Sequence, residues 1–424
     1  MRKNEESRPL SHVDAAWLRM DSPVNPMVIT TALTLEGQVP FEAIARVTEE
    51  RFLAHERFHL RVVDAQRPLL APRWEPDPQF DLRSHLHHLR VPAPGDEAAF
   101  AAVVSDLMST RLDPTRPLWQ TYVFDDAPGG TAIVSRFHHC LADGMALMRV
   151  LLGVCDGAGD EPLTEPGLRR PPTELNVRAL AAKTASYATT CGRLLLLPSD
   201  PPTILRGALG PRKRAARAEA LPLPTLKAKA KQLGGSLHDL LATLVTGALH
   251  RYLREQGVRT EGLTLRALVP MFLRDRDDTG LGNHFGLVFL DLPVGLSDRA
   301  QRFQTVKEHM DRLKAQDDAV VAFAVLDAVG IASSELEHIA LEVFSRKASL
   351  LLSDVPGIEA PMRIAGYPLN DVSVWAPVSG YLGVGITAVS YAERLRLSVY
   401  SDARLLADPR ELAYALDAEA ACYL

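Results

Sequence analysis

Residues 131–154, TAIVSRFHHCLADGMALMRVLLGV, decide how the fold of this chain is interpreted. Residues Ala132–Phe137 alternate weakly between apolar and polar and include β-branched side chains, which predicts a buried strand. Residues Met145–Val154 carry apolar side chains at helical spacing, which predicts a helix. The corner between the two elements, HHCLADG at residues 138–144, holds two histidines, an aspartate and a glycine.

The side chains of this corner suit proton transfer. Histidine has an unperturbed pKa close to neutral, so an imidazole held in place can accept a proton and return it. If the strand continues through His138 and His139, they point to opposite faces, so one is predicted to be the base and the other a packing or hydrogen-bonded partner. Asp143 can orient an imidazole or pair with a cation. Gly144 permits a positive φ or the close approach of a substrate.

A pair of adjacent histidines is, by itself, more often structural than catalytic. The complete string H-H-x-x-x-D-G is more specific than the pair. It resembles the active-site motif of the acyltransferases that share the chloramphenicol-acetyltransferase-like fold. We therefore take this corner as the candidate catalytic site.

The composition of the chain limits the classes of function that it can have. Its 424 residues leave room for two domains, and 47% hydrophobic with 23% charged residues is typical of a folded globular protein. The net charge of -5 argues against general binding to nucleic acid. The four cysteines lie far apart without C-x-x-C spacing, which predicts reduced thiols and no zinc site: Cys140, Cys155, Cys191 and Cys422.

Three further histidines, His85, His87 and His88, lack a carboxylate at ligand spacing, so we predict no metal site there. The N-terminal residues MRKNEESRPL contain no apolar segment of a secretory signal. The longest apolar runs fall short of the roughly 20 residues that a membrane-spanning helix needs. We expect a cytoplasmic protein, with any contact to a membrane or a lipid inclusion being peripheral.

The pattern of elements indicates an α/β protein with two domains. We expect an N-terminal domain over residues 1–155, an inter-domain crossover over 156–224 and a C-terminal domain over 225–424. The crossover is rich in Pro, Gly and Arg and is predicted to be partly helical around Ala179–Leu197. Its basic run, residues 211–217, is interpreted as a solvated loop, with attraction to anionic lipid or to CoA phosphates as the alternative.

Outside the corner, periodicity predicts helices and strands throughout both domains. One helix has a clear start and stop: Ser236 and Asp239 form an S-x-x-D capping box, and Gly257 ends it. The other predicted helices cover residues 41–52, 97–111 and 298–315, a largely helical stretch to 347, and a segment from 409. Strands are predicted at 27–35, from 119 onward, and at 263–269, 285–292, 349–353, 372–375, 384–391 and 395–400.

Along nearly its whole length the chain resembles the bacterial wax ester synthase/diacylglycerol acyltransferase family. The residues that carry this resemblance are spread over the sequence: Ser11, Asp14, Trp17 and Leu18 in an S-x-x-D-x-x-W-L pattern, Phe80, Asp81 and His85, Pro117-Leu118-Trp119, the corner motif, Gly282-Asn283, Val355-Pro356-Gly357 and Ser390-Tyr391. The chain departs from the family at two positions, where His238 and Asp354 replace the usual Asn.

The resemblance implies two chloramphenicol-acetyltransferase-like sandwich domains with an active-site channel at their interface. It implies an O-acyltransferase that moves a long-chain acyl group from acyl-CoA to a diacylglycerol or a fatty alcohol, making triacylglycerol or wax ester. His139 is then the general base, with His138, Asp143 and Gly144 as the rest of the catalytic motif. Acyl-CoA is a co-substrate, and no further cofactor is expected.

The resemblance also suggests which residues bind the substrate. The expected set is Pro117, Leu118, Trp119, Asn283 and Ser390, with Asn283 and Ser390 as candidate donors to the oxyanion. Asp143 is expected to hold the corner without touching the substrate. The chemistry needs no covalent acyl-enzyme, and the sequence has no G-x-S-x-G elbow for one.

Two other functions stay open on the sequence alone. The chain could be an acyltransferase that takes its acyl group from a carrier protein and passes it to a specialised hydroxyl or amine. It could also be a non-catalytic protein that binds lipid or coats lipid droplets. The whole-length resemblance favours the acyl-CoA-dependent enzyme.

Overall fold

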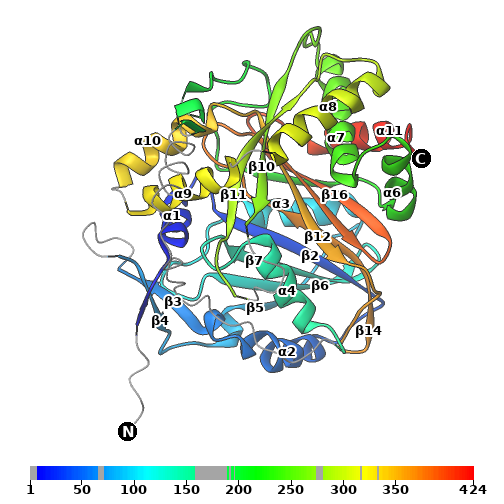
Figure 1. Cartoon of the computed structure of the whole chain (residues 1–424). Coiled ribbons are helices and arrows are strands. Elements are labelled where there is room, and N and C mark those ends of the chain that lie inside the picture. Colours follow the sequence, from blue (N-terminus) through cyan, green and yellow to red (C-terminus); the bar gives the residue numbers. More distant parts are fainter. Residues whose placement is uncertain are drawn as a thin grey trace.

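The structure is a computed structural model, and it describes residues 7–64, 71–157, 189–190, 192–194, 196–273, 280–315, 318–331 and 334–424. Within these residues the chain forms a mixed α/β fold with two large sheets and one small one (Figure 1). Most of the helical segment predicted around Ala179–Leu197 lies outside the described residues, as does Cys191.

The first large sheet contains the strand that was predicted before the corner. Its order is β13-β14-β2-β7-β6-β5. β6 and β7 form an antiparallel hairpin, in which Trp119 lies opposite Phe137. The strands of this sheet are β2 (Val28–Glu36), β5 (Leu86–Arg90), β6 (Trp119–Ala127), β7 (Gly130–His138), β13 (Arg363–Ile364) and β14 (Tyr367–Trp375).

The second large sheet has the order β11-β10-β12-β15-β16-β8, with β9 also paired to β16. Its strands are β8 (Lys213–Arg217), β9 (Leu221–Pro222), β10 (Leu265–Phe272), β11 (Phe285–Leu292), β12 (Leu350–Ile358), β15 (Val384–Tyr391) and β16 (Arg394–Asp402). A small sheet in the order β1-β4-β3 consists of β1 (Arg8–Pro9), β4 (Arg73–Pro76) and β3 (Leu60–Val63).

The two large sheets do not divide at residue 225. β13 and β14 come from the second half of the chain but complete the sheet of the first half, where β14 pairs with β2. In return, β8 and β9 precede residue 225 and belong to the second sheet. The two halves are therefore interlocked by exchanged strands.

The helices lie mainly in two groups around the sheets. In Figure 1, α6, α7, α8 and α11 lie together beside the second sheet, and α1, α9 and α10 lie together at the opposite side of the molecule. Both predicted bonds of the capping box at the start of α7 are present. The helices are α1 (His12–Met20), α2 (Phe41–Glu50), α3 (Glu97–Met108), α4 (Gly144–Val154), α6 (Leu223–Gln232), α7 (Leu237–Glu255), α8 (Arg299–Lys314), α9 (Asp318–Ile331), α10 (Ser334–Ser345) and α11 (Pro409–Ala420).

The core lies on both faces of the first sheet, and β7 shows why. Side chains alternate between the two faces of a strand. Ile133 and Phe137 pack into the cluster that includes α1, α2 and α4, while Ala132 and Val134 pack into a cluster with α3 and strands of the second sheet. Both faces of β7 are buried, which explains its weak alternation between apolar and polar residues.

The basic run at residues 211–217 is not a solvated loop, so that interpretation was wrong. Residues Lys213–Arg217 of the run form β8, and the side chain of Lys213 is fully buried. Lys213 Nζ donates to Asp402 Oδ2 at 2.6 Å, to Gly210 O at 2.9 Å and to Val24 O at 2.8 Å. Val24 and Asp402 both lie 189 residues from Lys213 in the sequence, so the local sequence gave no sign of these two acceptors.

Among the described residues, no helix combines the length and the apolar character needed to cross a bilayer.

Removing the buried cation should destabilise the fold strongly. In Lys213→Met, Asp402 remains fully buried without its partner, and breaking such a pair costs about 3–5 kcal/mol. The free energy of unfolding in urea measures the loss. The matched control is Arg410→Met, which breaks an exposed pair with Asp408 and should cost less than about 1 kcal/mol. Equal losses in the two variants would contradict the prediction.

Candidate active site

The corner between β7 and α4 is fixed from the other half of the chain. Asp143 is the N-cap of α4, where its Oδ1 accepts from the Ala146 amide at 2.9 Å. Its Oδ2 accepts from the His284 amide at 3.1 Å, and its own amide donates to Gly282 O at 3.1 Å. Because Asp143 is fully buried, these bonds are shielded from water. Asp143 therefore holds the corner, as expected.

His138 is the hydrogen-bonded, packed member of the histidine pair. Its Nδ1 accepts from the Cys140 amide at 3.1 Å, which places the ring proton on Nε2, 3.9 Å from Asp21 Oδ1. The His138 amide donates to Leu118 O at 3.0 Å. Burial lowers the pKa of His138 to about 4, so the ring is neutral at pH 7.

His139 is held on one face and at one edge. Its ring stacks on Trp17 of α1, with centroids 4.0 Å apart and planes 9° apart. Its Nδ1 lies 2.9 Å from Asn283 Oδ1, and its amide donates to Met27 O at 2.7 Å. Burial lowers the pKa of His139 to about 4. The ring is therefore neutral at pH 7, which is the state a general base requires.

Asn283 contacts His139 directly, and both of its amide hydrogens are used. Nδ2 donates to Asp14 Oδ1 at 2.7 Å and to His139 O at 2.7 Å. The sequence suggested Asn283 as a donor to the oxyanion, but this geometry directs both hydrogens at protein atoms. Asp14 was not singled out as a functional residue from the sequence, although the S-x-x-D-x-x-W-L pattern contains it.

A cavity opens beside His139 and Gly144, and its empty space, together with the solvent at its mouth, measures about 710 Å³. Strands of both sheets contribute to its lining, including Ile29 of β2 and Ser353 of β12. Gly144 does not have the positive φ that was one of its two predicted uses. A Cβ there would lie 3.5 Å from Val355 Cγ2, so the glycine leaves space between the corner and β12.

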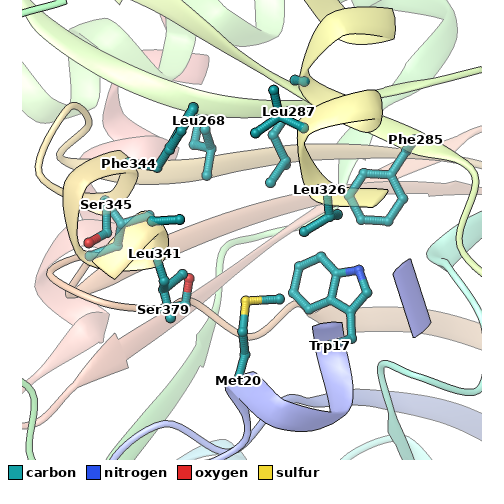
Figure 2. A pocket seen from close by; sticks show the side chains of 14 residues that line it. Trp17, Met20, Leu268, Phe285, Leu287, Leu326, Leu341, Phe344, Ser345 and Ser379 are labelled. Carbon is teal, nitrogen blue, oxygen red and sulfur yellow. The ribbon is translucent and has the colours of Figure 1, made fainter. Parts of the chain in front are cut away.

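A second cavity adjoins the first, and its empty space, measured in the same way, is about 780 Å³. Figure 2 shows Trp17 and Met20 of α1 on one side of it and Leu341 and Phe344 of α10 on another. Its lining is almost entirely apolar. Six residues line both cavities: Trp17, Leu268, Phe285, Leu287, Ser379 and Leu382. The stacking partner of His139 therefore stands where the two cavities meet.

Pro117, Leu118 and Trp119 brace the corner and, within the described residues, line neither cavity. Leu118 O receives the bond from His138 given above, and Trp119 Nε1 donates to Phe58 O at 2.8 Å. The Trp119 ring stacks on His85, which in turn stacks on Phe80. His85 Nδ1 lies 2.8 Å from Trp119 O. This arrangement does not support the substrate-binding role expected for these three residues.

Ser390 likewise lines neither cavity in the described part of the chain. Its Oγ accepts from the Gly357 amide at 3.3 Å, and a Cβ on Gly357 would come within 1.4 Å of Ser390 O. Ser390 therefore contacts the last part of β12, where the register with β15 shifts between Val355 and Ile358.

The two departures from the family pattern meet in space. His238 Nε2 lies 2.8 Å from Asp354 Oδ2, and this hydrogen bond raises the pKa of His238. The pair joins the start of α7 to β12. No group of three or more His, Cys, Asp or Glu among the described residues could hold a metal ion.

The neutral, oriented His139 lines a cavity to which both large sheets contribute, an arrangement that fits an acyltransferase of the two-domain fold expected above. The sequence profile of the wax ester synthase/diacylglycerol acyltransferase catalytic domain matches residues 10–191, and that of the family's C-terminal domain matches residues 281–420. The chain belongs to this family.

Relatives of known name agree with this assignment. A Mycobacterium tuberculosis protein named as a diacylglycerol O-acyltransferase is 27% identical over 437 residues, covering 94% of this chain and 86% of the relative. A second such protein from this organism, tgs1, is 25% identical, covering 96% and 94%.

Solved structures show the same fold. The wax ester synthase/diacylglycerol acyltransferase from Marinobacter aquaeolei VT8 aligns with a TM-score of 0.73 at 20% identity, covering 98% of both chains. The first condensation domain of the calcium-dependent antibiotic synthetase aligns with a TM-score of 0.65 at 16% identity, covering 99% of this chain and 96% of that one.

The buried histidines should make stability depend on acid pH. An unfolded histidine binds a proton below about pH 6.5, whereas folded His139 does so only near pH 4. The unfolded state thus binds more protons in this interval, and the free energy of unfolding should fall as the pH drops from 6.5 towards 4. In His139→Gln, urea unfolding at several pH values should show a shallower fall than in the wild type. An identical fall in both proteins would contradict the pKa shift.

Proposed function

We propose that the protein transfers a long-chain acyl group from acyl-CoA to the hydroxyl of a diacylglycerol, and that a fatty alcohol can take the place of this acceptor. The observation that carries the proposal is a neutral His139 lining a cavity that adjoins a larger, almost wholly apolar one. The names of the mycobacterial relatives support diacylglycerol as the acceptor.

The proposed reaction is a direct transfer in which His139 is the general base. An amide oxygen can only accept, so Asn283 Oδ1 accepts the Nδ1 proton and leaves the Nε2 lone pair available. Nε2 removes the hydroxyl proton of the acceptor as its oxygen attacks the thioester carbonyl. The C–O bond forms, the C–S bond then breaks, and the CoA thiolate takes the proton back from the imidazolium. The ester product carries the acyl group, and no acyl-enzyme is formed.

The negative charge that develops on the carbonyl oxygen needs a donor. The indole N–H of Trp17 is buried and, among the described residues, has no hydrogen-bond partner. Trp17 lines both cavities, so its side chain stands beside the space in which a substrate would lie. We assign the Trp17 N–H to the substrate in place of Asn283, whose amide hydrogens are already used.

Loss of the base should remove most of the activity. For His139→Ala we expect acceptor-dependent thiol release from palmitoyl-CoA, with dioleoylglycerol or hexadecanol, to fall by about 10²–10⁴-fold. Because the pKa of His139 is lowered to about 4, wild-type kcat/KM should stay level through pH 6.5 and decline only nearer pH 4.

Circular dichroism should show that the variant is folded. Thiol release that survives the substitution would remove His139 as the base. If the wild type releases no thiol from acyl-CoA but transfers from an acylated carrier protein, the donor is wrong; if it only binds lipid, the protein is not this enzyme.

Filling the apolar cavity should shorten the acyl chains that are accepted. Ala322 of α9 lines this cavity, and Ala322→Phe places a large ring in it. We expect turnover of palmitoyl-CoA to fall at least about tenfold, while that of butyryl-CoA stays within about twofold, since each excluded methylene forfeits about 0.8 kcal/mol. The matched control is Ala324→Phe on the exposed side of the same helix. An equal loss for both chain lengths would show that this cavity does not hold the acyl chain.

A further inference from the structure

We propose that Asp14, acting through Asn283, fixes the tautomer of His139, and that the N-terminal helix α1 is thereby a positioning element of the catalytic site. This inference rests on the proposed role of His139 as the base. It concerns three residues from three distant segments, Asp14, Asn283 and His139, which we call the tautomer chain.

The first step is the orientation of the Asn283 amide. Asp14 Oδ1 receives two donors from Asn283, the main-chain N–H at 3.2 Å and the side-chain Nδ2 at 2.7 Å. A main-chain N–H can only donate, so this carboxylate oxygen acts as an acceptor whatever the ionisation of Asp14. If the side-chain amide of Asn283 were flipped, its oxygen would face two other acceptors, Asp14 Oδ1 and His139 O, and could bond to neither. In the observed orientation, His139 O receives the second amide hydrogen.

The second step follows from the first. With its nitrogen directed at Asp14, the amide presents its oxygen to His139 Nδ1 at 2.9 Å. That oxygen cannot donate, so the proton of the neutral ring must be on Nδ1 and the lone pair on Nε2. With the opposite tautomer, Nε2 would carry the hydrogen and could not accept the proton of a hydroxyl.

The third step explains the spacing of the S-x-x-D-x-x-W-L pattern. Ser11 is the N-cap of α1, and its Oγ accepts from the Asp14 amide at 3.1 Å, which starts the helix. Residues three apart lie on one face of a helix, so Asp14 and Trp17 face the same side. Asp14 orders the edge of His139 through Asn283, and Trp17 covers its face. One short helix thus acts on both the protonation pattern and the plane of the ring, and the main-chain carbonyl of His139 is a further acceptor for the ring N–H.

Asp14 and Asn283 are both buried, and the chain joins α1 to a segment of the second half. Buried polar groups of this kind are costly when a partner is missing. Burial raises the pKa of Asp14. The Arg57 guanidinium has a smaller effect and lowers this pKa. Substitutions here should therefore include a variant that preserves the acceptor oxygen.

The first experiment measures the tautomer in the wild type by ¹⁵N NMR of histidine-labelled protein, with the His139 signals assigned by comparison with His139→Gln. We expect His139 with its hydrogen on Nδ1, and an Nδ1–H signal that is lost or shared with Nε2 in Asn283→Leu. A wild-type ring with its hydrogen on Nε2 would overturn the proposal, whether or not any variant folds.

The second experiment compares Asp14→Ala with Asp14→Asn in steady-state kinetics. Asp14→Ala removes the acceptor, and kcat should fall at least about tenfold, towards the roughly 10⁴-fold seen when a catalytic histidine is locked in the wrong tautomer, with KM changed by less than about threefold. Asp14→Asn keeps an acceptor oxygen of the same shape and should recover most of kcat. Equal kcat in Asp14→Ala and the wild type would refute a role for Asp14.

The matched control is Glu419→Gln, which changes another buried carboxylate on α11, far from α1 in Figure 1. It should lower thermal stability without changing kcat or the His139 signal.

The outcomes for the proposed function and for the present inference can be told apart. If the wild type transfers no acyl group, the proposed function is refuted, and the NMR result still shows whether the tautomer chain is correct. An active wild type with the wrong tautomer would end the present inference and the Nε2 step of the proposed mechanism, but not the acyl transfer itself.

Discussion

The site depends on one constraint: both ends of the His138–Asp143 corner are tied to residues that arrive from the second half of the chain. Asp143 bonds to Gly282 and His284, and His139 bonds to the residue between them, Asn283. These bonds are buried, where an unmade hydrogen bond is expensive. The segment at 282–284 can therefore neither shift nor open without leaving polar groups unpaired on both sides. A rigid corner of this kind suits a reaction in which the base must be within hydrogen-bond reach of a hydroxyl.

Burial also sets the electrostatics of the site. Removing water from His138 and His139 favours their neutral forms more strongly than the nearby carboxylates Asp21 and Asp143 favour the charged ones. A base with so low a pKa is a weak one, but it is ready at any physiological pH. The same dry environment strengthens the hydrogen bonds that direct its ring.

Much of the fold could be predicted from local patterns. The apolar periodicity of the helices near 41–50, 237–255 and 299–314 and of the strands at 285–292 and 384–391 is strong, and the structure has elements there. The strand β8 was missed because its cations are neutralised by distant groups, such as Asp402 for Lys213. The membership of β14 in the first sheet is also a long-range pairing that periodicity cannot reveal.

The candidate site was predicted in part. The corner motif located the two histidines, and the alternation of a strand indicated that they differ in role. The structure distinguishes them by their ring partners: the nearby Cys140 amide orders His138, whereas Asn283, far away in sequence, orders His139. The same limit applies to Trp119, because the sequence pattern alone could not show whether this residue packs in the core or lines a pocket. Its indole N–H donates to Phe58 O, and its ring stacks on the ring of His85.

The exchanged strand β14 has a consequence for how the polypeptide is made. During synthesis β2 is complete once residue 36 has left the ribosome, but the strand that covers its outer edge, through pairs such as Leu33 with Val372, follows more than 300 residues later. Until then the nascent N-terminal half presents an apolar sheet edge able to pair with other chains. Folding cannot finish domain by domain, so the completed sheet, and with it the corner motif, forms only when nearly the whole polypeptide is available.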